Sequence, residues 1–335
     1  MVTYVLGAGA SRHAGYPLAN ELGNRLHDWV RQNWADEIIW KGYIEALHKH
    51  YGGLADLELV LTELYERPAG SRATALSTTW CGNTLGGLRV AIPEFFNSLR
   101  DRPLIGPDLY RSLARHKARN GEAILTFNYD LAVESAFRKE ALWEIGDGYG
   151  FSLGVGITPT SKVKVLKLHG STNWLGILFD GNMGFSQYSR VYGPRPTLLR
   201  ESDFRYLGYS NVVRDPHCKG VSLTGGDPAL VLPTLHKNFF HQTSSGREWE
   251  PFWNHIWGQA ANVLHSSEKI VIIGYSIPAA DERARELLLG HSNSNAEISV
   301  FSGSRTDAIC EAFRKSGFRI VKSSGKGRFE DFLSN

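Results

Sequence analysis

The sequence predicts an α/β protein built on a Rossmann-like, doubly wound parallel sheet. Three observations carry this prediction: strand-like and helix-like segments alternate, an apolar strand near the start runs into a glycine-rich turn, and a helix follows that turn. The 335 residues suffice for one large α/β domain, and 42% hydrophobic with 21% charged residues is ordinary for a globular protein. The expected fold also contains a helical insertion and an irregular insertion, and no zinc ribbon.

The first elements are a strand, a glycine turn and a helix. Residues 2–6 (VTYVL) predict a short buried strand, GAGAS follows, and residues 17–31 place leucines on one helical face. Together they form the first half of a βαβ unit. The stretch from there to about residue 118 carries helix-period apolar residues, as in DLELVLTELYER, and we expect it to be helical.

Strands and helices then continue to alternate, with one interruption. EAILTF and KVKVLKLHG predict strands on either side of the helix DLAVESAFRK, and a later strand is expected at 269–273, after a helix. Residues 171–228 mix aromatic residues, glycines and prolines without a clear period, which indicates an irregular insertion with short strands. We therefore expect one unit with a Rossmann-like core at 1–30, 119–175 and 228–335, a helical insertion at 31–118 and an irregular insertion at 176–227.

Composition narrows the classes of partner and site. A net charge of +3 does not indicate binding to nucleic acid or to an anionic membrane. Cys81, Cys218 and Cys310 lie far apart without CxxC spacing, so neither a metal site nor a disulfide framework is expected. We see no signal peptide and no apolar run of bilayer length, and we expect a cytoplasmic protein without direct membrane binding.

Small or polar residues follow each of four predicted strands. In open parallel sheets, ligands bind outside the carboxyl ends of the strands, so these residues are expected at one rim. They are Gly7, Ala8, Gly9 and Ser11 after the first strand, Asn128 and Asp130 after the second, His169 after the third, and Gly274, Tyr275 and Ser276 after the fourth, with Asp281 near the next helix start.

Each of these turns has both a structural and a functional interpretation. The GxG of the first turn fits a tight strand-to-helix connection or a cradle for phosphate at a helix N-terminus. Asn128 and Asp130 precede a helix and fit capping roles. A lone histidine before a glycine, as at His169, is more often structural than catalytic. The four turns together match the pattern of a known family, and this resemblance favours the functional interpretation.

The four motifs in this order resemble the sirtuin (SIR2) superfamily, and most closely the bacterial SIR2-like branch of antiphage defence systems. The matching stretches are GAGAS...GYP, TFNYD, KLHGS and VIIGYSIPAAD. The chain departs from the sirtuin deacylases at several points. Only Cys218 stands where they carry a four-cysteine zinc ribbon, Leu18-Ala19-Asn20 stand where they have Asp-Phe-Arg, and Phe127 replaces the usual glutamine. No segment resembles their acyl-lysine binding segment. These departures disfavour protein deacylation. They are compatible with NAD+ binding and with cleavage of its glycosidic bond.

The resemblance implies that NAD+ lies across the rim as the substrate, without a metal. Asn128 and His169 would be catalytic: Asn128 would contact the nicotinamide ribose or position a water, and His169 would act as general base. The other residues that the resemblance assigns to NAD+ are Gly7, Gly9 and Ser11 at the pyrophosphate, Gly274 and Ser276 at the adenosine half, Asp130 at the nicotinamide carboxamide, and Ala8, Tyr275 and Asp281 in further contacts.

The implied activity is that of an NAD+ glycohydrolase, which releases nicotinamide and ADP-ribose or a cyclic form of it. As a defence effector that depletes NAD+, it would be gated by homo-oligomerisation or by a partner, such as an ATPase or a nucleic-acid-guided protein. Two alternatives stay open: an NAD-dependent protein deacylase or ADP-ribosyltransferase, and a non-catalytic module that binds NAD+ or ADP-ribose.

Overall fold

The structure is a computed structural model and describes residues 1–33, 45, 47–52, 56–66, 84–100, 102–151, 159–176, 198–200, 211–213, 227–234, 246–323 and 327–334. Its centre is a six-stranded, entirely parallel sheet in the order β10-β9-β8-β1-β2-β3. The strands are β1 (Val2–Leu6), β2 (Ala123–Thr126), β3 (Lys164–Lys167), β8 (Lys269–Ile273), β9 (Glu297–Phe301) and β10 (Ile320–Ser323). The predicted fold class is confirmed.

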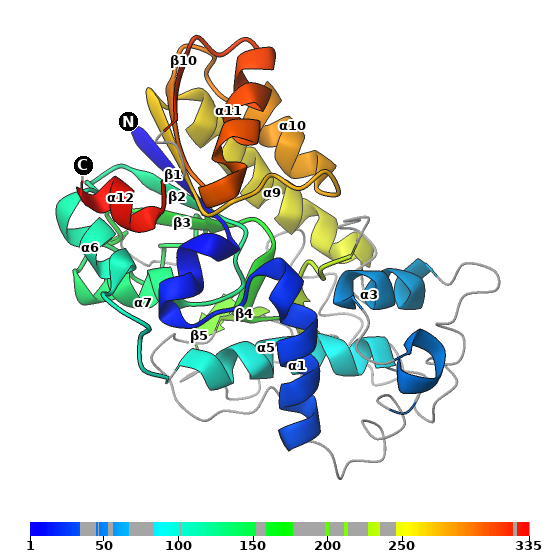
Figure 1. Ribbon diagram of the computed structural model, residues 1–335. Coiled ribbons are helices and arrows are strands. Elements are labelled where there is room, and N and C mark those ends of the chain that lie inside the picture. Colours follow the sequence, from blue (N-terminus) through cyan, green and yellow to red (C-terminus); the bar gives the residue numbers. More distant parts are fainter. Residues whose placement is uncertain are drawn as a thin grey trace.

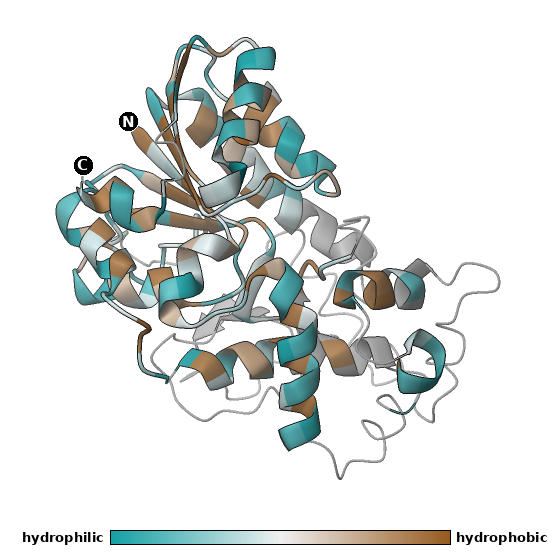
Figure 2. Ribbon diagram, viewed as in Figure 1, coloured by the Kyte–Doolittle hydropathy of each residue, from teal (hydrophilic) through white to brown (hydrophobic). Residues whose placement is uncertain are grey.

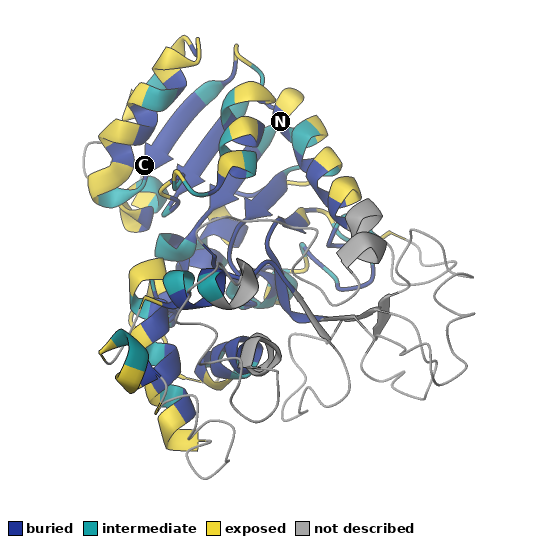
Figure 3. Ribbon diagram, turned by 90° about the vertical axis from the view of Figure 1, so that its right-hand side faces the viewer, coloured by how far each residue is buried: buried dark blue, intermediate teal, exposed yellow. Residues whose placement is uncertain are grey.

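Helices cover both faces of this sheet, which explains why its central strands are almost continuously apolar (Figures 2 and 3). The helices around it are α6 (Leu109–His116), α7 (Ala132–Lys139), α9 (Gly246–His265), α10 (Glu282–Gly290), α11 (Thr306–Lys315) and α12 (Phe329–Ser334). The short helix α12 was not expected from the sequence; it packs against α6 and β9 (Figure 1).

A second hydrophobic core joins helices within residues 31–118 to segments outside that range, among them α1 (Ala19–Asn33), Leu230 and Leu232. Helices α1, α3 (Leu57–Glu66) and α5 (Thr84–Arg100) pack together, and α5 also contacts β4 (Gly170–Gly176) and β7 (Asp227–Leu230). These two strands belong to a four-stranded sheet, in the order β5-β6-β4-β7, with β5 (Leu198–Arg200) and β6 (Asn211–Val213). Because β4 begins directly after His169, this second sheet is attached at the rim of the first.

His27 lies fully buried on the inner face of α1, and burial lowers its pKa from 6.5 to about 4. The unfolded chain binds this proton near pH 6.5, whereas the folded chain binds it only near pH 4. We therefore expect the free energy of unfolding to fall by about 3 kcal/mol as the pH drops through this window. Urea unfolding of the wild type and of His27→Gln between pH 7 and pH 4 measures this difference.

The exposed His116 provides the control for this experiment, because His116→Gln should keep the pH dependence of the wild type. Equal pH dependence in the wild type and in His27→Gln would contradict the prediction.

Candidate active site at the carboxyl ends of the strands

The order of the strands in the six-stranded sheet indicates where a ligand would bind. The chain builds β1, β2 and β3 outward in one direction, then returns to the other side of β1 to build β8, β9 and β10. The direction of winding therefore reverses between β1 and β8. In doubly wound sheets, the crevice at this switch point, outside the carboxyl ends of the strands, is where ligands bind. The turns after β1 and β8 both lie there.

These two turns touch through their backbones. The N–H of Gly9 donates to the carbonyl of Gly274 at 2.9 Å, and the N–H of Gly7 donates to the carbonyl of Ile273 at 3.0 Å. A Cβ on Gly274 would lie 2.2 Å from the amide nitrogen of Ala10, and Gly274 has a φ of +61°. Glycine at position 274 is therefore required both by the approach of the two loops and by its backbone conformation.

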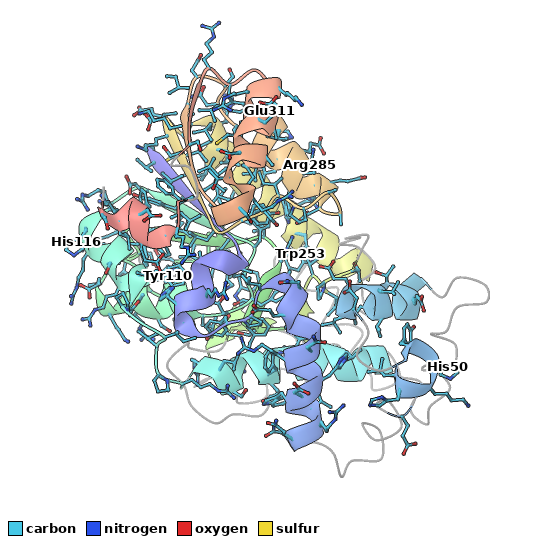
Figure 4. All side chains as sticks on the ribbon, in the orientation of Figure 1. His50, Tyr110, His116, Trp253, Arg285 and Glu311 are labelled. Atoms are coloured by element: carbon cyan, nitrogen blue, oxygen red, sulfur yellow. The ribbon has the colours of Figure 1, made fainter. Side chains whose placement is uncertain are left out.

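The glycine turn continues into a 3-10 helix, η1 (Ala8–Ala14), and Ser11 on this helix is buried. The Ser11 hydroxyl forms a 2.7 Å hydrogen bond with the hydroxyl of Tyr110, on α6 (Figure 4). Burial raises the pKa of Tyr110 well above its ordinary value, so this hydroxyl stays neutral.

Asn128 connects the turn after β2 to the glycine turn. Its Nδ2 donates to the carbonyl of Gly7 at 2.9 Å and to Oγ of Ser11 at 3.0 Å, and the residue is 9% exposed. Its backbone N–H donates to Oγ1 of Thr126 at 3.1 Å. The amide side chain is therefore held in one orientation by groups from both strands.

His169 follows β3 at the level of Asn128. The register pairs Thr126 with Lys167, so Asn128 and His169 each stand two residues beyond a paired position on neighbouring strands. The His169 side chain is buried, and its Nε2 lies 2.8 Å from Oδ2 of Asp281.

Aromatic rings lie against the His169 imidazole. The ring of Phe127 lies edge-on to His169, with 5.0 Å between centroids. The same ring stacks on Tyr275 at 4.0 Å and an interplanar angle of 7°. Phe127 and Tyr275 thus form an apolar wall beside the imidazole.

The two predicted aspartates both sit at helix starts. Oδ1 of Asp130 accepts from the N–H of Ala132 at 3.0 Å, at the beginning of α7. Oδ1 of Asp281 accepts from the N–H of Ala284 at 3.2 Å and caps α10, while its Oδ2 accepts from the hydroxyl of Tyr275 at 3.2 Å. Oδ2 of Asp281 therefore lies close to both the Tyr275 hydroxyl and Nε2 of His169. The sequence pattern did not indicate the proximity to His169.

The remaining predicted residues lie on the two facing turns. Gly7 is buried, Ala8 and Gly9 are half-buried, and Ser276 is exposed. The structure thus joins Gly7, Ser11 and Asn128 by hydrogen bonds and links Gly9 to Gly274. It places Tyr275 and His169 on either side of the Asp281 carboxylate oxygen Oδ2.

A buried ion pair beneath the rim escaped the sequence interpretation. Nζ of Lys167 lies 2.8 Å from Oε1 of Glu134, both side chains are fully buried, and Lys167 also donates to the carbonyl of Asp130. Tyr149 donates to the same Glu134 oxygen at 3.2 Å. Burial raises the pKa of Glu134. The available signal was the position of Lys167 between Leu166 and Leu168 at the end of a predicted strand, since a buried lysine needs an anionic partner.

Metal centres and membrane spans are two further features that would define a class of protein. Within the described ranges, no group of three or more histidine, cysteine, aspartate or glutamate side chains is arranged to hold a metal ion. The helices of the described part of the chain include none that is long and apolar enough to cross a membrane.

No family model and no curated protein matches the chain. Among solved structures, one described as "Structural Basis for the Mechanism and Regulation of Sir2 Enzymes" is similar, with 14% sequence identity and a TM-score of 0.40. The similarity covers 99% of this chain and 90% of that chain. The function therefore has to be inferred from the geometry of the site itself.

Proposed function

We propose that the chain is an NAD+ glycohydrolase, which binds NAD+ at the switch point and cleaves the bond between nicotinamide and ribose. One observation carries the proposal: Asn128 and His169 stand at matching levels of neighbouring strands, beside two glycine turns at the switch point. The donor set fits the substrate, because Ser11 offers a hydroxyl, Asn128 an amide and His169 an imidazole to its polar groups.

Cleavage of the nicotinamide–ribose bond by water needs a positioned base and polar groups that stabilise the developing charge. Nicotinamide leaves with the electrons of the C1′–N1 bond, and positive charge develops on the ribose. Water forms the new bond to C1′ and gives a proton to His169, which releases it to solvent. An imidazole nitrogen can accept this proton, and the fixed amide dipole of Asn128 can stabilise the developing charge.

The arrangement of the loops supports a gated enzyme. The N–H groups of Gly7 and Gly9 and the amide of Asn128 all have protein acceptors, so a bound pyrophosphate would have to displace some of them. Depletion of NAD+ is toxic, and gating by homo-oligomerisation or by a partner, such as an ATPase or a nucleic-acid-guided protein, would keep a cytoplasmic defence effector silent. We extend the proposal to this antiphage role.

Purified protein incubated with NAD+ and no peptide tests the activity, with the products resolved by chromatography. We expect nicotinamide together with ADP-ribose or its cyclic form, and their loss in Asn128→Ala. A silent protein is tested again with candidate activators. Activity that strictly requires an acylated peptide would overturn the proposal in favour of a deacylase. Tight NAD+ binding without turnover, in the presence of activators, would favour a regulatory module.

A further inference from the structure

The hydroxyl of Tyr110 connects a covering helix to the polar groups of the glycine turn. Tyr110 lies on α6 and is 1% exposed, and its hydroxyl forms a 2.7 Å hydrogen bond with Oγ of Ser11. Oγ of Ser11 also accepts from Nδ2 of Asn128 at 3.0 Å, because an amide NH₂ group can only donate. A continuous line of hydrogen bonds therefore runs from α6 through the glycine turn to the turn after β2.

The partners of the Asn128 amide fix its orientation. The carbonyl of Gly7 can only accept, so the amide atom 2.9 Å from it is Nδ2 and not Oδ1. Both hydrogens of Nδ2 are thus used within the protein, one by Gly7 and the other by Ser11. Oδ1 accepts no hydrogen bond from the described part of the chain. It is therefore the polar atom of this side chain that is left for a ligand.

The ring of Tyr110 is held in place independently of its hydroxyl. It packs edge-on against His13 of η1, with 4.9 Å between centroids, and against Phe329 of α12, with 5.6 Å. Nδ1 of His13 lies 2.9 Å from the carbonyl of Ala10, next to Ser11 on the same 3-10 helix. A phenylalanine at position 110 would keep these ring contacts, so that substitution isolates the hydrogen bond.

The Tyr110 hydroxyl keeps its proton. Burial raises its pKa well above the ordinary value and the Asp130 carboxylate raises it further, whereas the neighbouring side chains of Ser11 and Asn128 act in the opposite direction. The hydroxyl is therefore neutral at physiological pH, and either it or the Ser11 hydroxyl can be the donor in their mutual hydrogen bond.

We infer that Tyr110 is a positioning residue: through Ser11, its hydroxyl holds the Asn128 amide with Nδ2 on the glycine turn, so that Oδ1 accepts a hydrogen bond from the ribose or from the attacking water. This inference rests on the proposed function for the identity of the ligand. Oδ1 is also the negative end of the amide dipole, which suits the positive charge that develops on the ribose. Tyr110 thus contributes to the site from α6, outside the turns that follow the strands.

Tyr110→Phe tests the inference in ligand-free protein labelled with ¹⁵N-asparagine. The side-chain NMR signal of Asn128 is identified by its loss in Asn128→Ala. In the wild type, we expect the Nδ2 hydrogens to exchange slowly with solvent. In Tyr110→Phe, we expect this exchange to be about tenfold faster, the change expected for the loss of one hydrogen bond. Ser11→Ala removes the intermediate hydroxyl and should accelerate the exchange in the same way.

The NAD+ assay tests whether Tyr110 acts through Ser11. We expect kcat and kcat/KM of Tyr110→Phe to fall together by about tenfold, because the contact from Oδ1 strengthens in the transition state. The double variant Tyr110→Phe with Ser11→Ala should lose little more activity than Ser11→Ala alone, since both substitutions interrupt the same line of hydrogen bonds. Thermal unfolding checks that each variant is folded.

The matched control is Tyr51→Phe. The Tyr51 hydroxyl donates to Oε2 of Glu63 at 2.5 Å, so this variant also removes one phenolic hydrogen bond. Its neighbour His50 lies far from Tyr110 (Figure 4). Tyr51→Phe should keep both the exchange of the Asn128 amide and the NAD+ turnover of the wild type.

Unchanged exchange of the Asn128 amide in Tyr110→Phe, or additive losses of activity in the double variant, would overturn the inference. The exchange measurement needs no turnover. A protein that shows the expected exchange, yet cleaves no NAD+ with or without candidate activators, would overturn the proposed function and leave the role of Tyr110 in holding Asn128 established.

Discussion

Replacement of His169 by alanine is expected to lower NAD+ turnover by about 10²–10⁴-fold, the usual range for the loss of a general base. The imidazole is buried beside Asp281 at the carboxyl end of β3, so the variant removes the group proposed to accept the proton from water. The initial rate of nicotinamide release at saturating NAD+ measures the effect.

His116→Ala is the control for this variant, because His116 lies on the outer surface of α6 and far from the proposed chemistry (Figure 4). It should retain the activity of the wild type. Thermal unfolding and near-ultraviolet circular dichroism check that His169→Ala is folded, and His169→Gln provides a second variant that fills more of the same space. Unchanged turnover in a folded variant would remove His169 from the mechanism.

Lys167→Met should destabilise the protein more than any of the active-site substitutions, with a loss of about 3–5 kcal/mol in the free energy of unfolding. The substitution leaves Glu134 buried without its cation, and it also removes a donor from the carbonyl of Asp130. Urea unfolding at pH 7 measures the loss.

The double variant Lys167→Met with Glu134→Leu distinguishes a lost ion pair from a lost packing contact. An apolar pair of similar volume removes the uncompensated charge, so the double variant should lose much less than the sum of the two single variants. Lys315→Ala is the exposed control: it breaks the surface contact of Lys315 with Glu311 and should change stability by less than about 1 kcal/mol. Additive losses in the double variant would contradict the prediction.

The core of the fold was predictable because its signals are local. Strands covered on both faces are apolar throughout, and the predicted strand 269–273 coincides with β8, Lys269–Ile273. The amphipathic periodicity of the sequence likewise indicated the helices that cover the sheet, except for the short helix α12. Residues 171–228 lack such a period, and there the four-stranded sheet depends on pairing between distant segments, such as β4 with β7.

The turns after the strands make contacts that could not be predicted from neighbouring residues in the sequence. Gly274 faces Ala10 from the other side of the switch point, a close approach that cannot be inferred from either turn alone. Both aspartates do stand at helix starts, as their position before a helix allowed. The second oxygen of Asp281 reaches His169, because the loop after β8 folds back over the end of β3.

Sequence alone was therefore enough for the class of fold and for the set of polar residues that follow its strands, since hydrophobic period and turn composition act over a few neighbouring residues. The pairing of those residues was settled by the packed molecule: Asn128 with Gly7, His169 with Asp281, and Lys167 with Glu134. Such contacts depend on strand order, register and burial, which are properties of the whole chain and of no single segment.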